Sequence, residues 1–329
     1  MKKPDFLHYY QEPLHDRWHG KIDKQPKSRL HEIVKCFSLE QELPAATELT
    51  FALLGFACDI GVKRNQGRIG AAQGPDMIRR SLASLAWHRH PIPVIYDVGD
   101  IFCNNEELEE SQKALAEVIT LLKKKNIQPI VMGGGHETSW GHYMGLMEYD
   151  SKLDIGILSI DAHFDLHDVL HNDRGHSGSP FWQIAVDRKK RKLNFEYAVL
   201  GIQAMANNSF LFERAKELNT VIIRAAEWQS AREHANIKLD SFLQCQDAVF
   251  LTICLDSFNS AFAPGVSAPQ PLGLYPDTVI PIIQKMAESK RVFAIEVVEV
   301  NPFYDVDQRT ARLAASFIYE ILHYFRPIE

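Results

Sequence analysis

The sequence has few cysteines and no long hydrophobic run, which argues against a disulfide-rich protein and against a membrane-spanning one. Its 329 residues include only five cysteines, and no two of them form a C-x-x-C pair. Scattered cysteines, odd in number, predict reduced thiols in a cytoplasmic protein rather than a disulfide framework. No apolar run approaches the ~18–20 residues that span a bilayer, so no membrane segment is expected. Polar residues follow Lys2 and Lys3, so no signal peptide is expected either.

The sequence also lacks an excess of basic residues. It has 36 Lys and Arg against 42 Asp and Glu, which gives a net charge of -6 and a pI near 6.2. No basic face is available for a phosphate backbone, which argues against a nucleic-acid partner. With 46% hydrophobic and 24% charged residues, the composition is that of a soluble globular protein.

Eight short apolar runs recur after a polar N-terminal arm at residues 1–45. Each is followed by a turn bearing Gly, Asp or His and then by a helical pattern. The runs lie at 50–57, 93–98, 128–132, 155–160, 196–202, 220–225, 248–255 and 292–300. Such runs, separated by helices, predict a parallel sheet covered on both faces. Residues 46–329 are therefore expected to form one α/β domain.

Helices are predicted where apolar residues recur at helical spacing. The clearest are at 106–125, with a Glu-rich start and a Lys-rich end that match the helix dipole, and at 310–324. One short helix is expected around 28–37, within the N-terminal arm. These segments are packing elements, and we expect the chemistry elsewhere.

Four of the apolar runs end in polar groups that a structural turn does not require. They are followed by residues 133–138, 161–165, 254–256 and 299–302. Ligands of an open parallel sheet bind at the carboxyl ends of its strands, so these segments are expected to converge on one rim. Convergence of four segments is stronger evidence for a site than any one of them alone.

Asp161, His163 and Asp165 alternate along five residues directly after one run. An extended backbone would aim all three side chains at one point. Oxygen donors with one nitrogen suit a divalent cation such as Mn²⁺. The alternative is an acidic loop that caps a helix, and the other strand ends favour the metal site.

The remaining candidates each have a structural alternative. His136 follows three glycines and is either a ligand or a hydrogen-bonded loop residue. Cys254 and Asp256 are two apart and would share a face of a strand, although a buried cysteine is often inert. Glu299 is either a substrate-binding carboxylate or a salt-bridged one.

A polar, glycine-rich segment at residues 55–70 follows the first run. A long polar loop at the same rim is typical of a lid or a substrate clamp. Arg64 or Arg68 would then be available to bind a carboxylate.

These motifs, in this order, resemble the ureohydrolase (arginase/agmatinase) superfamily from about residue 53 to about residue 312. Within it, segments 65–75, 134–138 and 263–269 resemble the formimidoylglutamase subgroup. Members of that subgroup hydrolyse N-formimidoyl-L-glutamate to L-glutamate and formamide in histidine degradation. The resemblance implies a three-layer αβα sandwich on an eight-stranded parallel sheet.

The resemblance also implies a binuclear manganese site. The positions that match its ligands are His136, Asp161, His163, Asp165 and Asp256. Asp161 would bridge the two ions, and the family's other bridging carboxylate falls at Cys254. A thiolate is softer and donates through a single atom, so we expect a weakened or altered second metal site.

Further roles follow from the resemblance. Glu299 would hold the amidine nitrogens, Asp165 would relay a proton, and His176 would protonate the leaving amine. Arg68 would bind the substrate carboxylate, with His167 nearby.

Two departures from the family pattern keep other functions open. The arginases' catalytic His is replaced by Ser177, and a carboxylate common in the family is replaced by Asn259. The alternatives are another ureohydrolase, acting on a guanidino acid or agmatine, and a pseudoenzyme that binds a small molecule or partner without turnover. Relatives often form trimers or hexamers, so the resemblance also allows a homo-oligomer.

Overall fold

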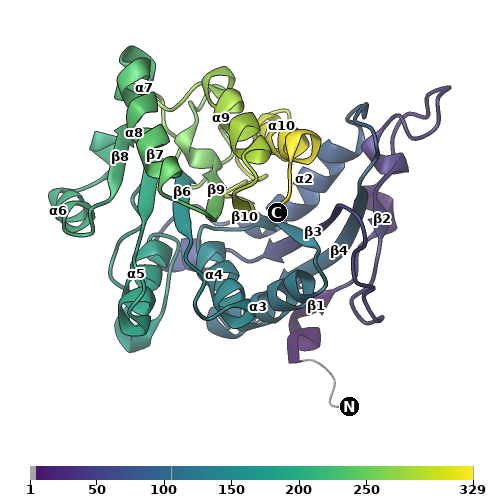
Figure 1. Ribbon diagram of the computed structural model, residues 1–329, viewed down its shortest axis with the longest axis horizontal. Helices are drawn as coiled ribbons and strands as arrows, with labels where there is room; N and C mark the ends of the chain where they lie inside the picture. The colour runs from purple at the N-terminus through teal and green to yellow at the C-terminus, as the bar shows by residue number, and fades with distance from the viewer. Residues whose placement is uncertain (1–4, 105, 329) are drawn as a thin grey trace.

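A ten-stranded sheet forms the middle layer of the protein in a computed structural model that describes residues 5–104 and 106–328 (Figure 1). Its order is β1-β4-β3-β5-β10-β9-β6-β7-β8, and β2 also pairs with β4. Among these described strands only the β1–β4 pairing is antiparallel. The bounds are β1 (Tyr10–Gln11), β2 (Lys35–Cys36), β3 (Thr50–Ala57), β4 (Val94–Phe102), β5 (Gln128–Gly133), β6 (Gly156–Ile160), β7 (Tyr197–Ile202), β8 (Val221–Arg224), β9 (Val249–Cys254) and β10 (Val292–Val298).

All eight predicted runs form strands, β3 to β10, but the predicted count of eight is corrected to ten. The two additional strands, β1 and β2, come from the N-terminal arm and pair with the outer edge of β4. Each is two residues long, too short to carry an apolar pattern. The helix predicted at 28–37 is wrong, because only Leu30–Glu32 turns, as a 3-10 helix, before β2 begins.

Helices cover both faces of the sheet, as predicted (Figure 1). One hydrophobic cluster packs α2, α8, α9 and α10 against one face, and a second packs α3, α4, α5 and α6 against the other. The predicted helices at 106–125 and 310–324 are confirmed as α3 and α10. The bounds are α1 (Ile60–Arg64), α2 (Gly74–Ala83), α3 (Leu108–Lys124), α4 (Thr138–Tyr149), α5 (Pro180–Arg191), α6 (Ser209–Glu217), α7 (Ala225–Ser230), α8 (Arg232–Gln244), α9 (Pro276–Glu288) and α10 (Arg309–Tyr324).

The structure can be compared with two predictions, that the cysteines are reduced thiols and that no segment spans a membrane. All five cysteines are free thiols. Within residues 5–104 and 106–328, no helix has the length and apolar character that crossing a bilayer requires.

The N-terminal arm is fastened to the sheet by buried polar contacts. Arg17 places Nε 2.7 Å from Asp76 Oδ1 and Nη1 2.7 Å from Asp100 Oδ2. The neighbouring Trp18 donates its indole N–H to Asp97 Oδ2 at 2.7 Å. The fully buried Arg79 contacts both Asp97 and Asp100. The arm therefore completes a charge cluster between α2 and β4.

We expect Arg17→Met to lower the free energy of unfolding by about 3–5 kcal/mol, because the change leaves buried Asp100 with one cation instead of two. Urea titration followed by circular dichroism measures the loss. Arg80→Met is the matched control, since Arg80 forms an exposed pair with the same Asp76. That pair contributes about 0–1 kcal/mol, so equal losses in the two variants would contradict the prediction.

The loss of stability in Arg17→Met should also depend on pH. Burial raises the pKa of Asp100, but the charges and hydrogen bonds of Arg79 and Arg17 outweigh it, and the pKa lies below its ordinary value. A carboxyl group whose pKa is lower in the folded than in the unfolded protein stabilises the fold at pH values above its unfolded pKa of about 4. This stabilisation is lost as the pH falls through the pKa of the folded protein. The difference between wild type and variant should therefore shrink below about pH 4.

Candidate metal centre

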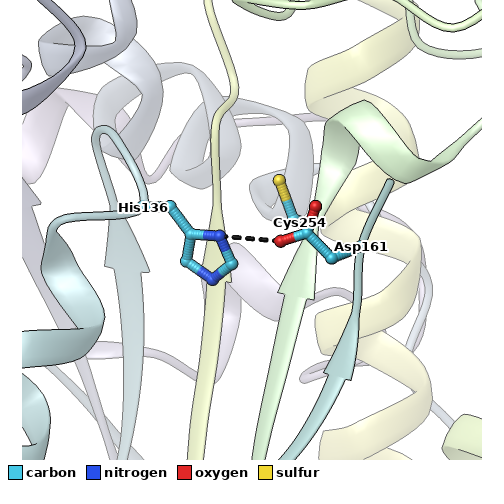
Figure 2. A group of neighbouring side chains, drawn as sticks. All are labelled: His136, Asp161 and Cys254. Atoms are coloured by element: carbon cyan, nitrogen blue, oxygen red, sulfur yellow. Dashed lines mark ion pairs between the residues drawn. The ribbon is translucent and has the colours of Figure 1, made fainter. Parts of the chain in front are cut away.

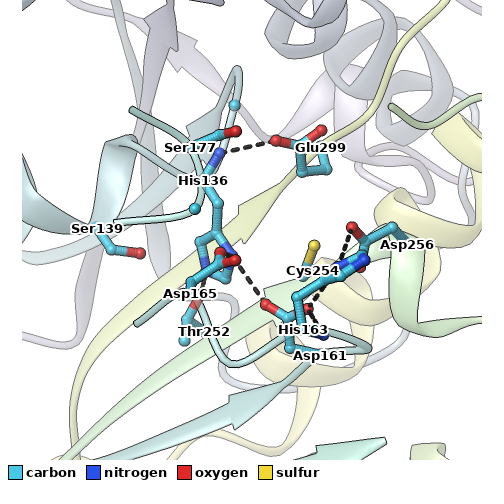
Figure 3. A network of polar contacts seen from close by, with 12 residues as sticks. His136, Ser139, Asp161, His163, Asp165, Ser177, Thr252, Cys254, Asp256 and Glu299 are labelled. Atoms are coloured by element: carbon cyan, nitrogen blue, oxygen red, sulfur yellow. Dashed lines mark hydrogen bonds and ion pairs between the residues drawn. The ribbon is translucent and has the colours of Figure 1, made fainter. Parts of the chain in front are cut away.

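The side chains that the sequence singled out converge at one edge of the sheet. Strands β5, β10, β9 and β6 are neighbours and run parallel, so their carboxyl ends meet there. The convergence is visible in Figure 3. The chain positions that these strand ends deliver are His136, Asp161, His163, Asp165, Cys254, Asp256 and Glu299. All are buried except His163, which is partly exposed.

One group of donors surrounds His136 (Figure 2). Its Nδ1 lies 2.9 Å from Asp161 Oδ2 and 2.9 Å from Asp165 Oδ2. The ligand atoms of His136, Asp161 and Cys254 all lie within 4.8 Å of one another. The Cys254 thiol therefore faces the same point as the imidazole and the carboxylate.

A second group of donors surrounds His163. Its Nδ1 lies 3.1 Å from Asp256 Oδ2 and 3.6 Å from Asp161 Oδ1. The ligand atoms of Asp161, His163 and Asp256 also lie within 4.8 Å of one another. Asp161 belongs to both groups and presents a different oxygen to each histidine.

These residues fit a divalent cation. Four buried atoms have no hydrogen-bond partner among the described residues, namely His136 Nδ1, Asp161 Oδ2, Asp256 Oδ1 and Glu299 Oε2. Buried polar atoms are normally paired, so four unpaired ones in one place call for a ligand. His136 Nδ1 lies near two carboxylates, yet neither contact has hydrogen-bond geometry. Imidazole nitrogen and carboxylate oxygen are ligands that Mn²⁺ accepts.

The electrostatics of the cluster are those of carboxylates forced together. Burial and the charge of Asp161 raise the pKa of Asp165 to about 6, although His136 and His163 act to lower it. Burial also acts to raise the pKa of Asp161, but contacts with His136 and His163 outweigh it and lower the value. The two carboxylates respond in opposite directions because Asp161 lies between both imidazoles.

Bent backbone, rather than the predicted extended one, delivers Asp161, His163 and Asp165. The strand β6 ends at Ile160, and the Asp161 carboxylate accepts the His163 backbone N–H at 2.7 Å. Asp165 has a left-handed φ of 48°, and Glu299 has one of 69°. Such conformations cost a residue other than glycine about 1–3 kcal/mol each and cluster at functional sites. The turn, not a strand, gathers the three side chains.

A second geometric expectation is also corrected. Cys254 is the last residue of β9, and Asp256 lies in the 3-10 turn Leu255–Ser257, so the two do not share a strand face. The turn lets Asp256 reach His163 while Cys254 reaches the His136 group.

Glycines bring the turn that carries His136 against neighbouring backbone. A Cβ at Gly134 would lie 1.7 Å from the carbonyl oxygen of Cys58. The Gly135 N–H donates to the same oxygen at 3.0 Å, and the His136 N–H donates to Glu299 Oε1 at 3.0 Å. The turn is therefore held against Cys58, which directly follows β3, and against Glu299, which directly follows β10.

A cavity of about 90 Å³ opens beside the donors. Its lining residues are Asn65, His136, His163, Asp165, His167, Ser177, Gly178, Ala206, Asn207, Leu211, Asp256, Ser267, Ala268 and Glu299. Sequence reasoning missed Asn207, which lies in a segment with no chemical signal of its own, and it included Ser267 only within the motif at residues 263–269. It named Asn65 and Ser177 only as parts of motifs.

Among the described residues, three that were predicted to bind substrate or to donate a proton do not line this cavity, namely Arg64, Arg68 and His176. The Arg68 guanidinium lies over the Tyr304 ring, 4.9 Å from its centroid. The Arg64 guanidinium is also engaged, with Glu109 and the Gly175 carbonyl. His176 receives the Gly178 N–H at Nδ1, at 3.2 Å, and its Nε2 lies 3.0 Å from the Asp168 carbonyl oxygen.

Both ring nitrogens of His176 therefore have backbone partners within its own loop. Burial lowers the pKa of His176. A neutral ring that accepts at Nδ1 must donate at Nε2, which matches the two contacts. The neighbouring His167 does line the cavity.

Comparison with known proteins places the chain in a family. A sequence model described as the arginase family matches residues 49–324. The chain belongs to the arginase family. It is 39% identical to the formimidoylglutamase of Legionella pneumophila (strain Paris) over 306 residues, which is 93% of this chain and 94% of the relative. It is 41% identical to the formimidoylglutamase of Lysinibacillus sphaericus over 316 residues, covering 93% and 95%.

A solved structure of Trypanosoma cruzi formiminoglutamase with Mn²⁺ has the same fold. The TM-score is 0.76 at 24% identity, with 84% of this chain and 93% of that chain covered. The predicted arginase-like αβα architecture is confirmed.

We expect Cys254→Asp to raise the amount of Mn²⁺ bound per chain, because a carboxylate offers two hard oxygens where the thiol offers one soft sulfur. Inductively coupled plasma mass spectrometry after equilibration and desalting measures the stoichiometry. Cys245→Asp, at an exposed cysteine, is the matched control. Unchanged stoichiometry in Cys254→Asp would show that the thiol is an inert part of the core.

Proposed function

We propose that this protein hydrolyses a C–N bond of a linear amidine, N-formimidoyl-L-glutamate, to L-glutamate and formamide. The observation that carries the proposal is the pair of donor groups that share Asp161 at the strand ends. Relatives 39% and 41% identical over 93% of the chain are formimidoylglutamases. Similarity at that level along almost the whole chain supports a common reaction.

We propose that the two donor groups hold two Mn²⁺ ions. His136, Asp161, Asp165 and Cys254 would serve one, and Asp161, His163 and Asp256 the other. Bound divalent cations supply Lewis acidity and activate water for attack on the amidine carbon. The unpaired nitrogen and oxygen atoms described above support this assignment.

Glu299 is proposed to hold the amidine nitrogens. Its Oε1 accepts the His136 backbone N–H, which fixes the carboxylate, and its Oε2 has no partner among the described residues. Glu299 also lines the cavity. A fixed carboxylate with one free oxygen suits charge-assisted hydrogen bonds to N–H groups of an amidine. Asp165, whose Oδ2 lies 2.9 Å from His136 Nδ1, is proposed to accept the proton that the attacking water loses.

His167 replaces His176 as the proposed proton donor to the leaving amine. His167 lines the cavity, whereas both ring nitrogens of His176 bond to its own loop. Holding that loop in place is the role we assign to His176. The ring centroids of His167 and His176 lie 6.1 Å apart, so a substitution at one histidine can disturb the other.

Binding of the substrate carboxylate remains assigned to Arg68. Its backbone N–H donates to the cavity residue Ser267 at 3.1 Å, so Arg68 lies at the cavity rim. Its guanidinium would have to leave Tyr304 to reach a substrate. The cytoplasmic location and the homo-oligomer remain predictions.

A binding protein without turnover is the second candidate. Ser177 faces the cavity where arginases place a catalytic histidine, and Cys254 replaces a carboxylate in the first donor group. The first departure removes a group that could transfer a proton, and the second removes a carboxylate that could bind a metal ion.

We expect the Mn²⁺-loaded protein to release glutamate and formamide in equal amounts from N-formimidoyl-L-glutamate. Asp161→Ala should abolish both release and Mn²⁺ binding, because Asp161 belongs to both donor groups. Chromatographic quantification of both products measures turnover. Asp187→Ala, at a carboxylate on α5 bonded to Tyr143, is the matched control. Urea release from guanidino substrates would indicate another ureohydrolase, and bound Mn²⁺ without any turnover would favour the binding protein.

We expect His167→Asn to lower kcat by about 10²–10⁴-fold, the usual contribution of a positioned general acid. His176→Asn should lower the thermal midpoint more than it lowers kcat, because its bonds serve the loop. Steady-state kinetics and thermal melts of the same preparations separate the two. The reverse pattern would return the proton-donor role to His176.

A further inference from the structure

The metal-site face of the central strands is arranged in rows. In the register of β10 with β9, Val298 pairs with Cys254, Glu296 with Thr252, and Ala294 with Phe250. In the register of β6 with β9, Ser159 pairs with Thr252 and Ile157 with Phe250. Alternate residues share a face, so Cys254, Thr252 and Phe250 lie on one side of β9.

The row directly below Cys254 is polar across three adjacent strands. It consists of Glu296, Thr252 and Ser159, all fully buried, and it separates the donor groups from an apolar row beneath. A polar row in the middle of a buried parallel sheet is unusual, because such strands are normally apolar on both faces. This row therefore calls for a reason.

Thr252 supplies one reason, since it contacts the metal-ligand candidate His136. The Thr252 hydroxyl oxygen lies 3.0 Å from His136 Nε2, the ring nitrogen remote from the donor group (Figure 3). The other nitrogen, Nδ1, lies 2.9 Å from the carboxylate oxygens of Asp161 and Asp165. A hydroxyl that accepts the Nε2–H fixes both the ring orientation and the tautomer, and it leaves the Nδ1 lone pair for a cation.

Glu296 holds the backbone of the same histidine through α4. Its carboxylate accepts the Ser139 hydroxyl and lies 3.0 Å from His142 Nδ1. The Ser139 backbone N–H donates to the His136 carbonyl at 3.1 Å. The one carboxylate of the row is thus occupied by α4, and His136 receives a neutral hydroxyl as its acceptor.

We infer that Thr252 is a positioning residue that orients His136 for metal binding, with Glu296 anchoring the turn that carries it. The inference rests on the proposed metal-dependent function and adds a residue to it. Partners of metal-ligating histidines typically contribute about 10–100-fold to metal affinity.

The test is Mn²⁺ titration of Thr252→Val, followed by the electron paramagnetic resonance signal of free Mn²⁺. Valine keeps the shape of threonine and removes the hydroxyl, so we expect the dissociation constant to rise about 10–100-fold. Thr252→Ser restores the hydroxyl and should restore the affinity. Thr120→Val is the matched control, because Thr120 is a buried threonine on α3 whose hydroxyl bonds to groups on α3 and α4.

Each outcome decides the matter. Weak binding in Thr252→Val, with wild-type affinity in Thr252→Ser and Thr120→Val, supports the inference. Wild-type affinity in Thr252→Val overturns it and leaves the proposed function intact. Wild-type protein that binds no Mn²⁺ overturns the proposed metal-dependent function and this inference with it. Thr252→Ala carries the same comparison in case the valine variant does not fold.

Discussion

Everything at this site depends on the common direction of four neighbouring strands, β5, β10, β9 and β6. Because they run parallel and lie side by side, groups from residues 136 to 299 arrive at a single edge. The same arrangement buries several carboxylates together, and the negative charge of each raises the free energy of ionising its neighbours. Two imidazoles placed among them compensate only part of that charge. A site built in this way is complementary to positive charge before any substrate is considered.

The sequence allowed the eight parallel strands β3 to β10 and the polar motifs at four of their ends to be predicted, because both signals are local. Apolar runs mark buried parallel strands, and each polar motif directly follows one of them. Features that depend on partners distant in the chain were missed. The strands β1 and β2 exist only because β4 offers them an edge, and the left-handed backbone of Asp165 has no pattern in its neighbours. The contact of Thr252 with His136 requires the folded arrangement of β9 beside the glycine turn. The ring direction of His176 is set by the Asp168 and Gly178 backbone, and no local pattern in the sequence indicates it.

The layered construction of the sheet face that packs against α4 bears on the proposed role of Cys254 as a ligand. The row of Cys254 lies next to the polar row of Glu296, Thr252 and Ser159. Thr252 contacts the His136 ring and Glu296 contacts α4, and neither contact involves Cys254. In the proposed metal site, a different ligand at Cys254 would therefore leave His136 supported by Thr252 and its turn supported by Glu296. In that proposal the metal ligands and the residues that orient them belong to adjacent rows, so a substitution at Cys254 would leave the hydrogen bonds of Thr252 and Glu296 in place.

The contacts of the N-terminal arm have a consequence for the behaviour of the sheet as a surface. An exposed edge strand offers unpaired backbone groups to any other strand and invites aggregation. Here the outer side of β4 is covered by β1 at Asp100 and Ile101 and by β2 at Tyr96 and Asp97. At the opposite edge, β8 has only four residues, from Val221 to Arg224. Two short flanking segments and one short terminal strand thus limit growth of the sheet, which disfavours edge-to-edge pairing between copies of this chain.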